Sequence, residues 1–234
     1  PPSRRSRGRP ADYERAMTSV WLEVLIDPGR LLDERETQPP VVIGAALLVR
    51  GQTREYQELA VTSQWPRLGE WPAERLTGPL GLLAALGLQV AGQPSIGPYL
   101  RLLAASDVEP TLRSAAVVLA AIALGADDRE EAALQLLQTA HAAETDASTR
   151  RFLVHHQAIH VAYLGGFADA AELSHRVASE PLDAPTGPDA TVSYLAQRNE
   201  RSFRWSMGSL EVPAVERRSH YPPLAEADAP VFDA

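Results

Sequence analysis

The helical pattern of the chain is most complete in residues 151–181, which read RFLVHHQAIHVAYLGGFADAAELSHRVASEP. Apolar residues recur at three- and four-residue intervals on both sides of Gly165, which is typical of two amphipathic helices. Glycine commonly closes a helix. The stretch therefore predicts a helical hairpin, with one helix over 149–164 and a second over 167–179.

Three earlier glycines stand in similar places. Gly51, Gly92 and Gly125 each close an Ala/Leu/Val-rich stretch, and the four glycines are spaced by 41, 33 and 40 residues. A period of this length predicts stacked helical hairpins, because one hairpin cannot bury its own apolar face. Asp127 or Asp128 is expected to cap the helix that follows Gly125. The other expected helices begin near residue 11 and cover 28–36, 41–50, 53–64, 79–91, 96–105, 111–124, 128–143 and 190–205.

Ala and Leu dominate the apolar residues, which favours packed helices over sheets. We expect an all-α fold, a right-handed α-solenoid of about five antiparallel hairpins with the last helix as a C-terminal cap. Residues 1–10 would form a flexible basic arm, and 11–205 the repeat domain, with a possible seam in the loop 65–77, which contains two Trp-Pro dipeptides. Residues 206–234 would be an irregular acidic tail that contains prolines.

Residues 151–181 resemble a tetratricopeptide repeat. The resemblance is carried by small or aromatic residues around the helix-closing glycine: Ala158, Gly165, Phe167, Ala170, Val177, Ala178 and Pro181. The units before it match less completely, and two of the three spacings exceed the roughly 34 residues of that family. A HEAT-like repeat is the competing interpretation, because 107–125 is similar to the second helix of such a repeat. Both resemblances imply a right-handed helical solenoid.

The tetratricopeptide resemblance also implies a concave groove in which a ligand would lie. Its predicted contact residues are Phe152, His155, Ile159 and Tyr163, with Leu112 and Leu119 one unit earlier. The Lys and Asn of the family's carboxylate clamp are absent at such positions, so an apolar or helical segment of a protein or peptide is the expected ligand.

Composition excludes several kinds of chemistry. The chain has no Cys and no Lys, so thiolate metal sites, disulfides, Schiff bases and a phosphate-loop lysine are all ruled out. The net charge of −8 disfavours a protein whose whole surface binds nucleic acid. No apolar run is long enough to span a bilayer. We expect a cytoplasmic protein that does not bind membranes, and a homo-oligomer through the terminal hairpins is possible.

Two local patterns suggest further activities. His156 and His160 have the spacing that places two imidazoles on one helix face, but Gln157 stands where a zinc protease has its general base. Separately, the sequence Arg7-Gly8-Arg9-Pro10 resembles the core of an AT-hook, a minor-groove DNA-binding element. Arg4, Arg5, Arg7 and Arg9 would then contact nucleic acid.

We find no nucleophile elbow, phosphate loop or paired catalytic acids. The sequence therefore predicts a non-catalytic scaffold or adaptor, without cofactor or metal, that binds protein or peptide. A helical-repeat regulatory or DNA-associated protein with a basic arm is the alternative, and a metal-dependent enzyme that uses the histidines is a third hypothesis.

Overall fold

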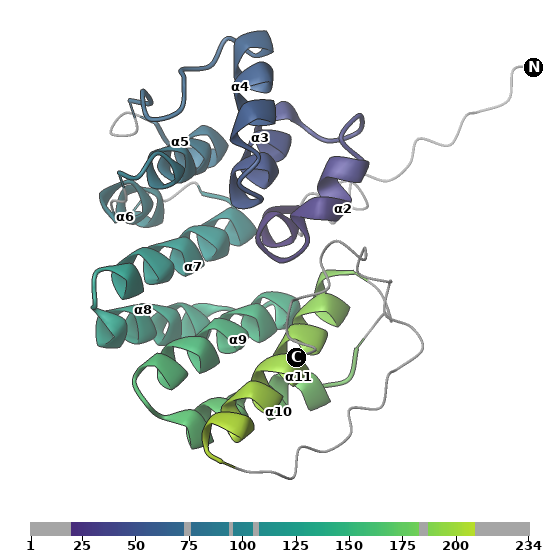
Figure 1. Ribbon diagram of the computed structural model, residues 1–234, viewed down its shortest axis with the longest axis vertical. Coiled ribbons are helices and arrows are strands. Elements are labelled where there is room, and N and C mark those ends of the chain that lie inside the picture. The colour runs from purple at the N-terminus through teal and green to yellow at the C-terminus, as the bar shows by residue number, and fades with distance from the viewer. Residues whose placement is uncertain (1–19, 73–75, 94–95, 105–107, 183–186, 209–234) are drawn as a thin grey trace, which may run out of the picture. The chain divides into compact units, whose positions relative to one another are not determined.

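The computed structural model describes residues 20–72, 76–93, 96–104, 108–182 and 187–208. The expected arm with Arg4, Arg5, Arg7 and Arg9, the start of the first helix, and nearly all of the expected tail lie outside these ranges. The described residues are helical and contain no strand (Figure 1). None of the described helices combines the length and apolar character needed to cross a membrane.

The chain divides into two compact units, residues 1–123 (unit 1) and 124–234 (unit 2). Residues 20–26 of unit 1 are helical. They are followed by α2 (Pro28–Asp33), α3 (Pro40–Val49), α4 (Thr53–Thr62), α5 (Gly78–Val90) and α6 (Gly97–Ala104). Helix α7 (Pro110–Ala126) contains the division between the units, and segment 65–77 lies inside unit 1.

Helix α3 forms the centre of unit 1 and contacts α2, α4 and α5 (Figure 1). Seven consecutive residues of α3, from Val42 to Leu48, are buried. A helix that is apolar all round is stable only when neighbours cover several of its faces. At the edge of this core, Trp71 Nε1 donates a hydrogen bond of 2.8 Å to the buried Tyr56 hydroxyl, which joins α4 to the following loop.

Unit 2 contains α8 (Glu130–Ala143), α9 (Ala147–Tyr163), α10 (Phe167–Ser179) and α11 (Pro188–Ser206). Each helix packs on the next in sequence, and α11 also contacts α9. Helix α9 is therefore enclosed on several sides. Its N-terminus is capped by Asp146, whose side chain accepts a hydrogen bond of 2.8 Å from the Thr149 N–H.

The expected helix positions agree with the structure to within one turn. Several of these helices end in one hydrogen-bonding pattern, the Schellman motif, which requires a residue with positive φ just after the helix. Gly165 has φ +85° and its N–H donates to the Ala162 carbonyl, while the Gly166 N–H donates to the Val161 carbonyl. The same pair of bonds follows α3 at Gly51 and α5 at Gly92.

The prediction at Gly125 was wrong. Gly125 lies inside α7, and the residue with positive φ after this helix is Asp128, at +57°. The Asp128 N–H donates to the Gly125 carbonyl and the Arg129 N–H to the Leu124 carbonyl, so Asp128 takes the usual place of glycine. Consequently neither Asp127 nor Asp128 caps α8. Its N-cap residue is Arg129, without a side-chain hydrogen bond.

Replacing the residue with positive φ should have opposite effects on stability at these two helix ends. Gly165→Ala should lower the free energy of unfolding by about 1 kcal/mol, whereas Asp128→Gly should raise it by about 0.5–1 kcal/mol, because a side chain is strained at positive φ. Denaturant unfolding of the two variants measures both effects. Gly29→Ala is the matched control, since Gly29 lies in α2 and an added Cβ meets only ordinary contacts of 3.7 Å or more. A loss of stability in Asp128→Gly would contradict the assignment.

Candidate functional site

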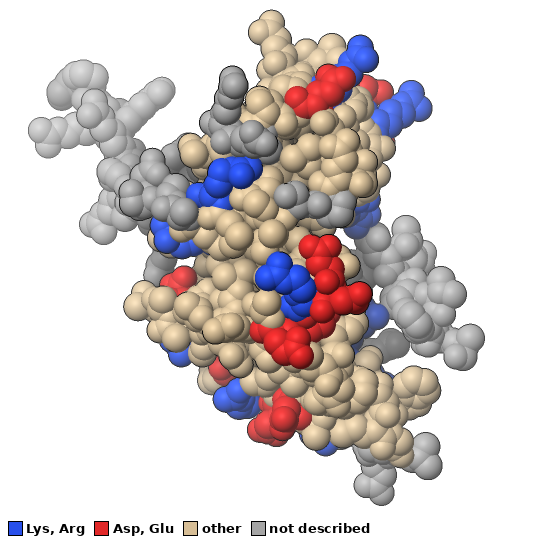
Figure 2. Space-filling view, turned by 90° about the vertical axis from the view of Figure 1, so that its left-hand side faces the viewer, with Lys and Arg blue, Asp and Glu red and all other residues tan. Residues whose placement is uncertain are grey.

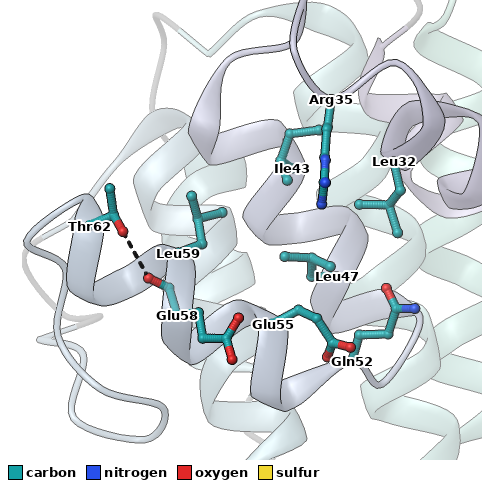
Figure 3. Close-up of a pocket in the computed structure, with 9 residues that line it drawn as sticks. All are labelled: Leu32, Arg35, Ile43, Leu47, Gln52, Glu55, Glu58, Leu59 and Thr62. Atoms are coloured by element: carbon teal, nitrogen blue, oxygen red, sulfur yellow. Dashed lines mark hydrogen bonds between the residues drawn. The ribbon is translucent and has the colours of Figure 1, made fainter.

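The described residues of unit 1 form a groove. It lies between α2, α3 and α4 and has a volume of about 530 Å³ (Figure 3). We call it the α3/α4 groove. Ligand pockets commonly enclose roughly 300–1,000 Å³, so the groove is large enough to hold several side chains of a ligand.

The floor of the groove is apolar. Ile43 and Leu47 of α3 form its deepest part and are each 7% exposed, while Leu32 of α2 and Leu59 of α4 are half-buried at its sides. Because α3 is apolar on every side, the face that α2 and α4 leave open still presents leucine and isoleucine. The groove therefore offers apolar surface that the chain's own helices leave partly uncovered.

The rim of the groove is polar and comes mainly from α4. This helix is amphipathic: Tyr56 and Ala60 are buried on one side, and Glu55, Glu58 and Thr62 line the groove at intervals of three and four residues. Such intervals place side chains on one helix face. Gln52, just before α4, completes this wall, and Figure 3 shows the Thr62 hydroxyl bonded to the Glu58 main-chain carbonyl.

The opposite wall carries a positive charge. Arg35 comes from the turn after α2, and Figure 3 shows its side chain extending between Ile43 and Leu32 toward Leu47. On the facing wall, within α4, Glu58 Oε1 pairs with Arg54 Nε at 3.4 Å. Both side chains are largely exposed, at 69% and 88%. A pair this exposed to water contributes little. The groove thus has an acidic wall and a basic wall above an apolar floor.

The six residues predicted to line a groove differ in their exposure. Phe152 and His155 of α9 are buried, 1% and 5% exposed, and fill the interior of unit 2. Ile159 is half-buried, whereas Tyr163 is 71% exposed at the end of α9. Leu112 and Leu119 are buried residues of α7. Four of the six are therefore buried in this structure, and Tyr163 is the one that is largely exposed.

The histidines of α9 form a mainly buried polar cluster instead. His160 Nδ1 lies 2.5 Å from Glu130 Oε2 at the start of α8, and both side chains have little exposure. Gly125 makes room for this carboxylate, since a Cβ there would lie 2.8 Å from Glu130 Oε1. One turn earlier, the rings of His155 and His156 meet edge to face at 5.3 Å.

Burial sets the protonation of this cluster. It lowers the pKa of His155 from 6.5 to about 4, and His155 Nδ1 has no hydrogen-bond partner. The pKa of His156 also lies well below its ordinary value, because surrounding protein atoms remove water and the charges of His155 and His160 would repel its own. His155 and His156 are therefore neutral in the folded state at neutral pH.

The described ranges contain no group of three or more His, Asp or Glu side chains arranged to hold a metal ion. His156 and His160 have the predicted spacing, but the Nδ1 of His160 is occupied by Glu130.

A second polar cluster connects α9 to the residues just after α10 and to the first turn of α11. The buried Arg151 guanidinium pairs with Glu180 at 3.2 Å and with Asp189 at 2.9 Å, and donates a further bond of 2.9 Å to the Pro181 carbonyl. The Ser148 hydroxyl adds a 2.9 Å bond to Asp189. Every partner lies within this one unit, so the cluster holds helices together.

Figure 2 shows one face of the molecule. Basic side chains on it lie singly or in small groups, some of them beside acidic ones. Phosphate binding draws on clustered positive charge. This face therefore shows charges of both signs.

No protein family, curated protein or solved structure matches the chain. The class that the structure itself defines is an all-helical protein of two compact units, one of which carries an apolar groove with charged walls.

Sequence reasoning missed the α3/α4 groove. The sequence of α4 contained one signal, because Glu55, Glu58 and Thr62 share a helix face with the apolar Leu59. The floor residues Ile43 and Leu47 gave no such signal, because the whole of α3 is apolar and its sequence does not show which face remains open.

Proposed function

We propose that this protein is a non-catalytic protein-interaction module, and that the α3/α4 groove of unit 1 is its binding site for a peptide segment of a partner. The observation that carries the proposal is the apolar floor of Leu32, Ile43, Leu47 and Leu59 beneath two charged walls. An apolar cleft with a few polar groups at its edges is the usual form of a ligand site.

The α-solenoid interpretation remains part of this proposal. It is supported by the hairpin of α9 and α10, which is joined at Gly165 and buries the small residues Ala158, Ala170 and Ala178 expected of a tetratricopeptide-like unit. Helical-repeat proteins commonly serve as extended binding surfaces. The proposal differs from the sequence-based expectation in placing the ligand on α2, α3 and α4 rather than on α9.

The test is selection of peptides from a random library against the full chain, followed by titration calorimetry. A selected peptide should shift amide resonances of α2, α3 and α4 in heteronuclear NMR spectra. Leu59→Glu should weaken binding at least tenfold, because it places a charge in the apolar floor of the groove.

Leu100→Glu is the matched control. Leu100 is also in unit 1 and is 46% exposed, but it lies on α6, outside the groove. It should leave the affinity unchanged. Equal loss in both variants, or resonance shifts confined to α9 and α10, would refute the assignment of the groove.

A further inference from the structure

The walls and floor of the α3/α4 groove indicate which kind of peptide segment would bind there. We infer that its occupant is an amphipathic α-helix of a partner protein, with an apolar ridge and Lys or Arg residues along the flank that faces α4. This inference rests on the proposed binding function of the groove.

The first argument concerns hydrogen bonding. Main-chain N–H and C=O groups inside α3 and α4 already bond within their own helices, and the floor is made of leucine and isoleucine. An extended peptide would find no strand edge along these walls, and its own main-chain groups would lose water without gaining partners. A helix satisfies its main chain internally and can present an apolar ridge to such a groove.

The second argument concerns length. The lining residues contributed by α4 and its N-cap run from Gln52 to Thr62. At a rise of about 1.5 Å per residue they span about 15 Å, which corresponds to roughly three turns of a partner helix. Apolar residues of the partner at positions i, i+3 or i+4, and i+7 would therefore lie along the floor.

The third argument concerns charge. Glu55 and Glu58 lie three residues apart on the exposed side of α4, and Arg35 lies on the opposite wall. The Glu58 carboxylate pairs with Arg54, but this pair is exposed to water and offsets little of its charge. A partner helix with basic residues toward α4 would meet two carboxylates, whereas an acidic flank would be repelled.

The experiment uses the full chain and two labelled synthetic peptides of about 18 residues, a length at which an Ala-rich helix is stable enough to form. Both carry Leu at i, i+3, i+4 and i+7 on an alanine background. One peptide has Lys along one flank of the ridge, and the other has Glu at the same positions. Fluorescence anisotropy measures affinity, and circular dichroism of the complex measures peptide helicity.

The Lys-flanked peptide should bind about three- to tenfold more tightly than the Glu-flanked one, with a difference that shrinks at high salt. In the double variant Glu55→Lys, Glu58→Lys the preference should reverse. Glu131→Lys, an exposed acid of α8 in unit 2, is the matched control and should leave the preference unchanged.

Each other result overturns the inference in a recognisable way. Equal affinities for both peptides that are lost together in Leu59→Glu would refute the basic flank while leaving the groove as a binding site. A bound peptide that is not helical would refute the helix. If library peptides bind in the groove but neither designed peptide binds, this inference is refuted while the proposed binding site stands. Leu59-dependent self-association in sedimentation, without peptide binding, would identify a second copy of the chain as the occupant.

Discussion

Replacing Arg151 with Ala is expected to lower the free energy of unfolding by about 2–4 kcal/mol. The guanidinium is 6% exposed and holds Glu180, Asp189 and the Pro181 carbonyl. Breaking a buried ion pair by removing one partner commonly costs about 3–5 kcal/mol, because the remaining charge is left without compensation. We expect a value toward the lower end, since Glu180 is half exposed and can regain water.

Denaturant unfolding followed by circular dichroism measures this loss, and amide hydrogen exchange should locate it in α9 and α11. Arg151→Lys should fall between wild type and Arg151→Ala, because an ammonium group lacks the planar fork that reaches several partners. Arg54→Ala is the matched control: its pair with Glu58 is solvent-exposed, and its loss should change stability little. If Arg151→Ala and Arg54→Ala were equally mild, the Arg151 cluster would not hold α9 and α11 together.

Acidification should destabilise the fold before most carboxylates are protonated. Burial holds the pKa of His155 at about 4, against 6.5 for an exposed histidine, so the unfolded chain binds more protons between these values. The free energy of unfolding is therefore unaffected by His155 protonation above pH 6.5, and it decreases as the pH falls from 6.5 toward 4. For His155 alone the loss is about 3 kcal/mol, and His156, whose pKa is also lowered, adds to it.

His155→Leu separates this effect from general acid denaturation. The variant removes the proton acceptor and the unpartnered Nδ1, so its stability should depend less on pH between 6.5 and 4. His175→Leu, on the exposed surface of α10, shows what the loss of a surface histidine does by itself. Free energies of unfolding measured across this range for the three proteins test the prediction. Parallel profiles for wild type and His155→Leu would contradict it.

The positions of the helices could be predicted because their signals are local. The three- and four-residue repeat of apolar residues marks each helix, and Gly51, Gly92 and Gly165 mark helix ends where the backbone needs positive φ. Glycine does not mark two of the helix ends, since Gln64 after α4 and Asp128 after α7 have positive φ instead. At the end of α7 the left-handed residue is Asp128, and aspartate is one of the few other residues that tolerate this conformation.

The candidate site could not be predicted in the same way. Phe152 and His155 have the pattern of a ligand-facing helix surface, yet both are buried. Tyr163, from the same helix, is largely exposed. The pattern of one helix shows which residues share a face, but it does not show whether another helix covers that face.

The sequence by itself determined that the chain is helical, where most of its helices begin and end, and which chemistries its composition excludes. These properties depend on backbone conformation and on residue types, which act over one or two helical turns. Only the tertiary structure decided that α9 is enclosed by its neighbours and that α2, α3 and α4 leave Ile43 and Leu47 at the floor of a groove. The physical reason is that burial depends on segments distant in the sequence, whose packing assigns each apolar face to the core or to a partner.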